Sequence, residues 1–279
     1  MNNKKNCFIM GYPSTGKTTF LTALWYVVSN GNIIDNSPIK LNNMGESSYL
    51  SSLLTSWIKA EPLIRTSLEN ENRNISIELV NKQNNIICNL NFPDLSGETF
   101  SDIYTSRKID KELYEMIENA DSFILFENIE RIKKPELISE LNIELEDSEH
   151  KNVARNPIND PTSIQLIELL QIIRKINKSP SINLNIVLSA WDLVSVKTNP
   201  KDYICSEMNI LWQYLMSNEN RYNIKFWGVS AQGGDLTADA EKLIEITDPE
   251  KRIIVVDSDG KESNDITLPI MGIMGENDE

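Results

Sequence analysis

The sequence has a single histidine, His150, and only three cysteines, Cys7, Cys88 and Cys205. One histidine nearly excludes histidine-dependent hydrolysis and histidine-rich metal sites. The cysteines are widely spaced, and two of them fall in strand-like runs. They predict reduced, buried thiols in a cytoplasmic protein, and they exclude a disulfide framework or a cysteine-based zinc site.

Positive charge is also scarce, because 27 Lys and Arg residues face 41 Asp and Glu residues, for a net charge of −14. Nucleic-acid binders usually carry basic surfaces, so no direct nucleic-acid partner is expected. No apolar run approaches the ~20 residues of a membrane-spanning helix, so no membrane contact is expected either. A hydrophobic content of 40% over 279 residues is sufficient for a sizeable globular core.

Strand-like runs alternate with amphipathic helical runs along the chain, which predicts a mostly parallel sheet with helices on both faces. The strand-like runs span residues 6–10, 74–80, 86–92, 122–128, 184–190 and 223–231. Apolar residues recur at helical spacing from residue 20 up to Gly31. The same spacing is found over 47–59, 109–117, 161–173, 203–216 and 238–246. Asp160 is the expected N-cap of the fourth of these helices. The strands at 74–80 and 86–92 are too close for a crossover helix, so they should pair antiparallel.

We expect residues 1–279 to form a single domain whose core spans about residues 6–247. The charged, irregular stretch 129–160 indicates a surface insertion. Residues 250–279 contain a predicted hairpin, KRIIVVDSDGKES, with a DG turn, and then an acidic tail.

The segment GYPSTGKTT, residues 11–19, carries the clearest motif. Gly11, Gly16, Lys17 and Thr18 fit the pattern G-x-x-x-x-G-K-[ST], with a strand before it and a helix after it. Glycines let the backbone N–H groups converge on phosphate oxygens, and the helix N-terminus favours negative charge. Lys17 would neutralise the β and γ phosphates, and the Thr18 hydroxyl would bind Mg²⁺. The remaining predicted nucleotide-binding residues of this loop are Ser14, Thr15 and Thr19.

Three weaker patterns follow, each after its own predicted strand. NFPDLSGET contains Asp94 and Gly97 in the spacing D-x-x-G, which a simple strand-to-helix turn would also produce. VLSAWDLV ends in Asp192, for which an N-cap role is the alternative. GVSAQGG contains Ser230 and Ala231 at the end of the last strand.

The four motifs occur in the order found in TRAFAC-type P-loop GTPases, and from Gly11 to about Gln232 the chain resembles that group. More narrowly, GYPSTGKTTFLTALW, FPDLSGE and LSAWD are similar to the double-GTPase families of bacterial conflict and defence systems. This resemblance implies a three-layer P-loop NTPase (G-domain) fold whose mostly parallel sheet has one antiparallel strand. It also implies GTP as substrate, Mg²⁺ as cofactor, and partner proteins from the same system, including another GTPase.

The resemblance assigns roles to the weaker motifs. Asp94 would hold Mg²⁺ directly or through water, and the Gly97 N–H would bond the γ phosphate. Asp192 would accept from N1–H and N2–H₂ of guanine, and a backbone N–H at Ser230 and Ala231 would meet guanine O6. The chain departs from the N-K-x-D pattern, because only its aspartate is present, and glutamine replaces lysine in the S-A-K pattern.

The catalytic residues are predicted from position alone. Glu98 stands where many such GTPases carry a water-orienting glutamine, although it would equally suit the first turn of a helix. Thr66 is the expected switch threonine, a ligand of Mg²⁺ and a contact of the γ phosphate. Arg65, beside it, would serve as an arginine finger in cis unless the loop is an ordinary solvated one. Thr55 and Ser67 are rival switch residues.

The leading hypothesis is a regulatory switch that binds and hydrolyses GTP, slowly when alone. A P-loop ATPase or small-molecule kinase is the first alternative, and a nucleotide-bound scaffold with little turnover is the second. The apolar stripe of the helix at 47–59 either packs on the domain or docks a partner in a nucleotide-dependent way.

Overall fold

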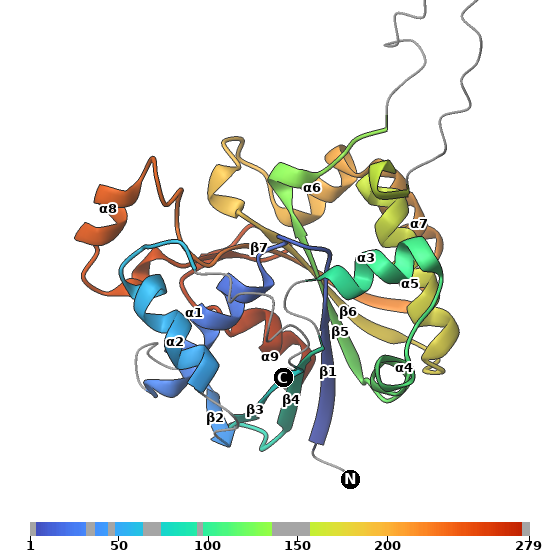
Figure 1. Cartoon of the computed structure of the whole chain (residues 1–279), viewed down its shortest axis with the longest axis horizontal. Coiled ribbons are helices and arrows are strands. Elements are labelled where there is room, and N and C mark those ends of the chain that lie inside the picture. Colours follow the sequence, from blue (N-terminus) through green and yellow to red (C-terminus); the bar gives the residue numbers. More distant parts are fainter. Residues whose placement is uncertain are drawn as a thin grey trace, which may run out of the picture.

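The structure, a computed structural model, describes residues 4–31, 37–43, 48–63, 74–93, 97–135 and 157–274. One large sheet runs through the molecule with helices on both faces (Figure 1). Two clusters of buried side chains, one on each face, fill the space between the sheet and the helices. This arrangement confirms the predicted three-layer α/β fold.

The sheet has nine strands in the order β2-β3-β4-β1-β5-β6-β7-β8-β9. The strands are β1 (Lys4–Met10), β2 (Ile39–Asn43), β3 (Ile75–Asn81), β4 (Ile87–Phe92), β5 (Ser122–Asn128), β6 (Ile182–Ser189), β7 (Tyr222–Ser230), β8 (Ile254–Val256) and β9 (Glu262–Ser263).

Five neighbouring strands, β4, β1, β5, β6 and β7, are parallel. β3 pairs antiparallel with β4, as predicted from the short connection between them. The C-terminal hairpin β8–β9 also forms as predicted. It pairs β8 antiparallel with β7 and so adds a second reversed strand to the sheet. The carboxyl ends of the five parallel strands therefore share one edge, where ligands of such sheets bind.

The helices are α1 (Lys17–Ser29), α2 (Ser48–Ile58), α3 (Glu98–Ser106), α4 (Lys111–Glu118), α5 (Thr162–Ile176), α6 (Pro200–Glu207), α7 (Asn209–Ser217), α8 (Ala240–Glu245) and α9 (Leu268–Met274). The first face of the sheet is covered by α1, α2 and α9, and the second by α3 to α7 (Figure 1). The apolar stripe of α2 is packed on the domain, with Trp57 fully buried.

Several elements differ from the expectation. The helix predicted over 203–216 is two helices, α6 and α7, separated at Met208 (φ −130°, ψ 47°). Ile204, Met208, Leu211 and Leu215 keep helical spacing across the break and are all buried, so the pattern conceals it. The sequence analysis also missed α3, β2 and α9. The last of these contains a proline and a glycine, which argue against a helix.

The described ends of the stretch 129–160 lie together, because Lys133 and Thr162 exchange two hydrogen bonds of 2.9 and 3.0 Å. The described parts of this stretch contain short 3₁₀ helices, η2 (Ile129–Arg131) and η4 (Pro157–Asn159). Cys7 and Cys88 are buried as expected, but Cys205 is exposed on α6, so the prediction of a buried thiol is wrong there. Within the described residues, no helix has the length and apolar character needed to cross a membrane.

Candidate nucleotide site

The loop between β1 and α1 carries the phosphate-loop motif. Its backbone is left-handed at Ser14 (φ 62°) and Gly16 (φ 86°), and α1 begins at Lys17. A turn of this kind followed by a helix N-terminus presents backbone N–H groups to an anion. A Cβ atom at Gly16 would lie 2.9 Å from the Ser189 side chain at the end of β6, so a larger residue does not fit there.

Lys17 lies folded over this loop. Its side chain is buried, and Nζ donates to the carbonyl oxygens of Gly11 (2.7 Å) and Tyr12 (2.8 Å). The Thr15 hydroxyl donates to the same Tyr12 carbonyl at 2.9 Å. These acceptors compensate the buried ammonium group for lost hydration. Phosphate oxygens at the loop would be stronger, charged acceptors for the same group.

Gly97 contacts the phosphate loop directly. It is left-handed (φ 81°) and immediately precedes α3. A Cβ atom added to it would lie 2.5 Å from the carbonyl carbon of Tyr12 and 2.7 Å from the carbonyl oxygen of Gly11. Only glycine permits both this conformation and this approach. The structure therefore brings the glycine of the D-x-x-G motif against the phosphate loop.

Tyr12 fastens the loop to the helices of the second face. Its hydroxyl donates to the Gln165 carbonyl of α5 at 3.1 Å, and its ring stands edge-on to Tyr104 of α3, with centroids 6.4 Å apart. Burial raises the pKa of Tyr12 above its usual range, so the phenol stays a neutral donor. The Tyr104 hydroxyl bonds the Asp160 carboxylate. The predicted N-cap role of Asp160 is wrong, because Pro161 holds that position of α5.

The second part of the site follows β6. Asp192 lies in a 3₁₀ helix, η5 (Trp191–Leu193), and the Trp191 ring packs against the backbone of Gly228 on β7. The next helix, α6, is capped by Asn199, whose side chain accepts from Asp202 N at 2.8 Å. Asp192 is therefore not an N-cap. Among the described residues, its carboxylate has no hydrogen-bond partner.

The loop after β7 lies beside the segment after β6 that carries Asp192. Ser189 pairs with Val229 in the parallel register of β6 and β7, so the two loops leave the same edge of adjacent strands. The Ser230 hydroxyl accepts from Gly233 N at 2.9 Å and closes this loop. The structure thus brings Asp192 and the segment Ser230–Ala231 to the edge that also holds the phosphate loop.

Some of the remaining predicted residues lie within the described part of the chain, and others lie outside it. Thr18 and Thr19 are half-buried in the first turn of α1, and Glu98 is exposed at the first position of α3. Thr55, the rival switch residue, lies within α2 and not in a loop. The other switch and metal predictions lie outside the described residues: Arg65, Thr66, Ser67 and Asp94.

Mg²⁺ fits the described part of the site through Thr18. Its hydroxyl is at the N-terminal turn of α1 and makes no hydrogen bond within the described residues, whereas its carbonyl accepts from Thr22 at 2.8 Å. Nowhere in the described ranges do three or more His, Cys, Asp or Glu side chains gather as a metal cluster. A metal at this loop would therefore depend on the hydroxyl and on nucleotide phosphates, which is the usual way Mg²⁺ binds.

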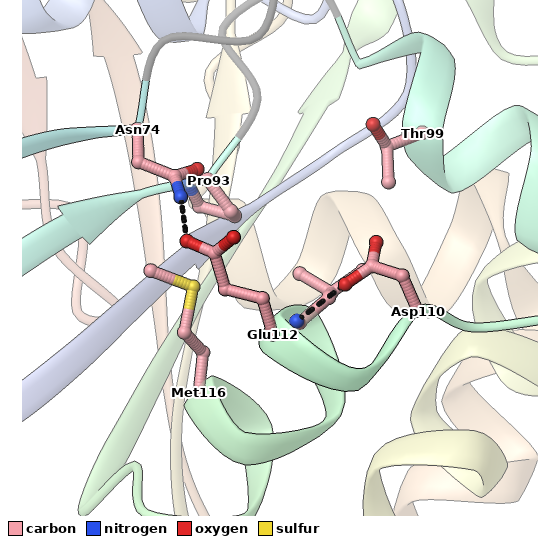
Figure 2. A pocket seen from close by; sticks show the side chains of 7 residues that line it. Asn74, Pro93, Thr99, Asp110, Glu112 and Met116 are labelled. Atoms are coloured by element: carbon pink, nitrogen blue, oxygen red, sulfur yellow. Dashed lines mark hydrogen bonds between the residues drawn. The ribbon is translucent and has the colours of Figure 1, made fainter.

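A small cavity of about 150 Å³ lies between the start of β3 and the helix α4 (Figure 2). Asn74 at the start of β3 donates to the Glu112 carboxylate of α4, and Asp110 caps α4 by accepting from Leu113 N at 2.8 Å. Pro93 and Thr99 also line the cavity. The cavity lies on the α3–α4 side and contains no residue of the phosphate loop.

Glu127 is a buried carboxyl that the sequence analysis missed. It is the penultimate residue of β5, a mostly buried strand, and it is only 3% exposed. Burial raises its pKa to about 7, although the Asn128 N–H (3.0 Å) and the positive charges of Lys17 and Arg131 act in the opposite direction. The signal in the sequence was one acidic residue inside the run SFILFEN, next to the strand of the phosphate loop.

We expect Glu127→Gln to change how stability depends on pH. A carboxyl whose pKa is raised on folding holds its proton more tightly in the native state, so native stability falls as pH rises from 4.5 to about 7. The variant lacks this loss. Its free energy of unfolding relative to the original should therefore rise by up to about 3 kcal/mol between pH 4.5 and pH 8.

Urea denaturation at pH 5 and pH 8 measures this difference. Glu130→Gln, which removes an exposed carboxyl three residues further along, controls for the loss of one charge. A stability difference between Glu127→Gln and the original protein that is the same at both pH values would contradict the assignment.

The glycine-rich loop between a parallel strand and a helix, with Gly97 and the loops after β6 and β7 near it, is typical of a P-loop nucleotide-binding protein of the GTPase class. The family model for Double-GTPase 1 matches residues 8–273, nearly the whole chain. The chain belongs to the Double-GTPase 1 family, which confirms the resemblance drawn from its motifs. No significant match to a curated protein was found.

Solved structures similar to this fold include GTPase domains. The GTPase-like domain of S. cerevisiae Ski7 bound to GTP has 17% identity and a TM-score of 0.44, with 83% of this chain and 43% of that chain covered. The RocCORdC structure of Methanosarcina barkeri Roco2 bound to GDP has 13% identity and a TM-score of 0.37, with 87% and 48% covered. The chain thus spans less than half the length of these two structures.

Proposed function

We propose that the protein is a regulatory switch that binds and hydrolyses GTP. The observation that supports the proposal is the contact of Gly97 with the backbone of Gly11 and Tyr12, because it brings the glycine of the D-x-x-G motif against the phosphate loop. Membership in a GTPase family supports the same conclusion. Lys17 would turn from the loop carbonyls to the β and γ phosphates, and the Gly97 N–H would sense the γ phosphate.

Guanine recognition is proposed for Asp192 and Ala231. A carboxylate accepts from both N1–H and N2–H₂ of guanine, whereas it would face the unprotonated N1 of adenine. Ser189 replaces the asparagine of the usual pattern, and its contact with Gly16 supports the view that this position still joins the base side to the phosphate side. Ser230 shapes the loop from which the Ala231 N–H would reach guanine O6.

Thr18, Thr66 and Asp94 would hold Mg²⁺, which would offset the charge of the β and γ phosphates. Arg65 would contact the transferring phosphate, and Glu98, at the first position of α3, would orient the attacking water. Loss of the γ phosphate would release the segment after Gly97. Because α3 follows Gly97 and contacts Tyr12 through Tyr104, this change would reach the surface of α3.

Partner proteins would detect that surface. The motifs shared with double-GTPase families support partners from one bacterial defence or conflict system in the cytoplasm, including a second GTPase. Turnover without such a partner would be slow, on the order of 10⁻³ s⁻¹, as in other GTPases that await an activator.

Competition for a labelled guanine nucleotide tests the proposal. With Mg²⁺ present, GTP should displace the label at a concentration at least ~100-fold lower than ATP, as two lost charged hydrogen bonds require. Equal displacement by ATP would favour an ATPase or kinase. GTP binding with no phosphate release, alone or with partner proteins, would leave a nucleotide-bound scaffold.

A further inference from the structure

A tryptophan of α2 donates a hydrogen bond to the loop that carries Ala231. Trp57 is fully buried, and its indole N–H donates to the Ala231 carbonyl at 3.0 Å across 174 positions of sequence. Within the same loop, the Ser230 hydroxyl accepts a hydrogen bond from Gly233 N at 2.9 Å. The peptide plane that follows Ala231 is therefore fixed by a buried hydrogen bond from a helix outside the known motifs.

Trp57 is itself held in place by a buried cation. Arg252 is 3% exposed, and its Nη2 donates to the Trp57 carbonyl at 2.7 Å, while the guanidinium carbon lies 5.0 Å from the centre of the indole ring. The Tyr26 ring of α1 also packs against Trp57, with centroids 5.1 Å apart. An indole ring that packs against a cation and against a second aromatic ring has little freedom to rotate. Its N–H therefore points at one acceptor.

We propose that Trp57 is a positioning residue for guanine recognition, and that it acts by orienting the Ala231 backbone toward the base. This inference rests on the proposed function. The Ala231 carbonyl and the Ala231 N–H belong to peptide planes joined at one α-carbon, so a fixed carbonyl restricts the direction of the N–H. Trp57 would not touch the nucleotide, and the phosphate contacts would not depend on it.

The chain offers a matched control in Trp227 of β7, three residues before Ser230. Its indole nitrogen is buried and has no hydrogen-bond partner among the described residues. Trp57→Phe and Trp227→Phe therefore remove the same ring volume and one buried N–H each, but only the first removes a bond to the base loop.

The experiment measures affinities for a non-hydrolysable GTP analogue and for inorganic tripolyphosphate, which has no base. Trp57→Phe should weaken the GTP analogue about five- to tenfold, the worth of one buried hydrogen bond and its loop geometry, and leave tripolyphosphate unchanged. Trp227→Phe should leave the ratio of the two affinities as in the original protein. An unchanged ratio in Trp57→Phe would overturn the inference, even if that variant were less stable.

A second measurement uses the original protein and does not depend on the folding of a variant. In protein with ¹⁵N-labelled tryptophan, the Trp57 indole resonance should shift on saturation with the GTP analogue and stay in place with tripolyphosphate. If the resonance does not shift with the GTP analogue, the inference about Trp57 is wrong, but the proposed function is unaffected. Failure of the original protein to prefer GTP over ATP would instead overturn the proposed function, and the inference with it.

Discussion

Lys17→Met should lower the affinity for GTP about 100-fold and reduce GTP hydrolysis to background. The ammonium group is the only Lys or Arg nitrogen bonded to the phosphate loop within the described residues, where it donates to the carbonyls of Gly11 and Tyr12. Methionine keeps the length and apolar stem of the side chain but removes the charge. Two charge-assisted bonds to phosphate at about 1.5 kcal/mol each account for the expected loss.

Equilibrium binding of a fluorescent GTP analogue, together with phosphate release, measures this effect. Lys5→Met is the matched control, because Lys5 lies on β1, the strand before the loop, and donates to the Ile273 carbonyl at 3.1 Å, away from the loop. A melting curve verifies that Lys17→Met is folded. A folded Lys17→Met variant that binds the analogue as tightly as the original protein would refute the phosphate site.

Asp192→Asn should exchange the preferred base. The carboxylate accepts two hydrogen bonds from guanine, and an amide places a donor where guanine also presents a donor. We expect GTP affinity to fall about 100-fold. Xanthosine triphosphate, which has an oxygen at position 2, should gain affinity because the new amide N–H has an acceptor there.

Competition of both nucleotides against one label gives the ratio directly. Asp202→Asn, which neutralises an exposed aspartate of α6 further along the same connection, controls for charge. If Asp192→Asn keeps the preference for GTP over xanthosine triphosphate, the base lies elsewhere and the assignment of Asp192 is wrong.

Local patterns were sufficient to predict most of the fold. The segment 122–128 matches β5 because a central parallel strand is a short, continuous apolar run. The antiparallel pairing of β3 with β4 followed from the length of the connection between them, since a short connection cannot cross over to a parallel strand. The break at Met208 was not predictable in this way, because its apolar spacing continues from α6 into α7.

The places of the motifs in the fold were predictable for the same reason, since each motif is a short local pattern that follows a strand. The residues that support them were not. Trp57 reaches Ala231 across 174 positions, and its apolar helix indicated only that it would be buried. Ser189 contacts Gly16 through the packing of β6 beside the loop, a contact that no single pattern contains. Such contacts depend on the complete fold.

The most direct test of this account is a crystal structure of the protein with a non-hydrolysable GTP analogue and Mg²⁺. The account predicts that Lys17 Nζ has turned from the Gly11 and Tyr12 carbonyls to the β and γ phosphates. It also predicts that the guanine edge meets the Asp192 carboxylate and the Ala231 N–H. Phosphates bound away from the loop of residues 11–18, or a base without contact to Asp192, would contradict it.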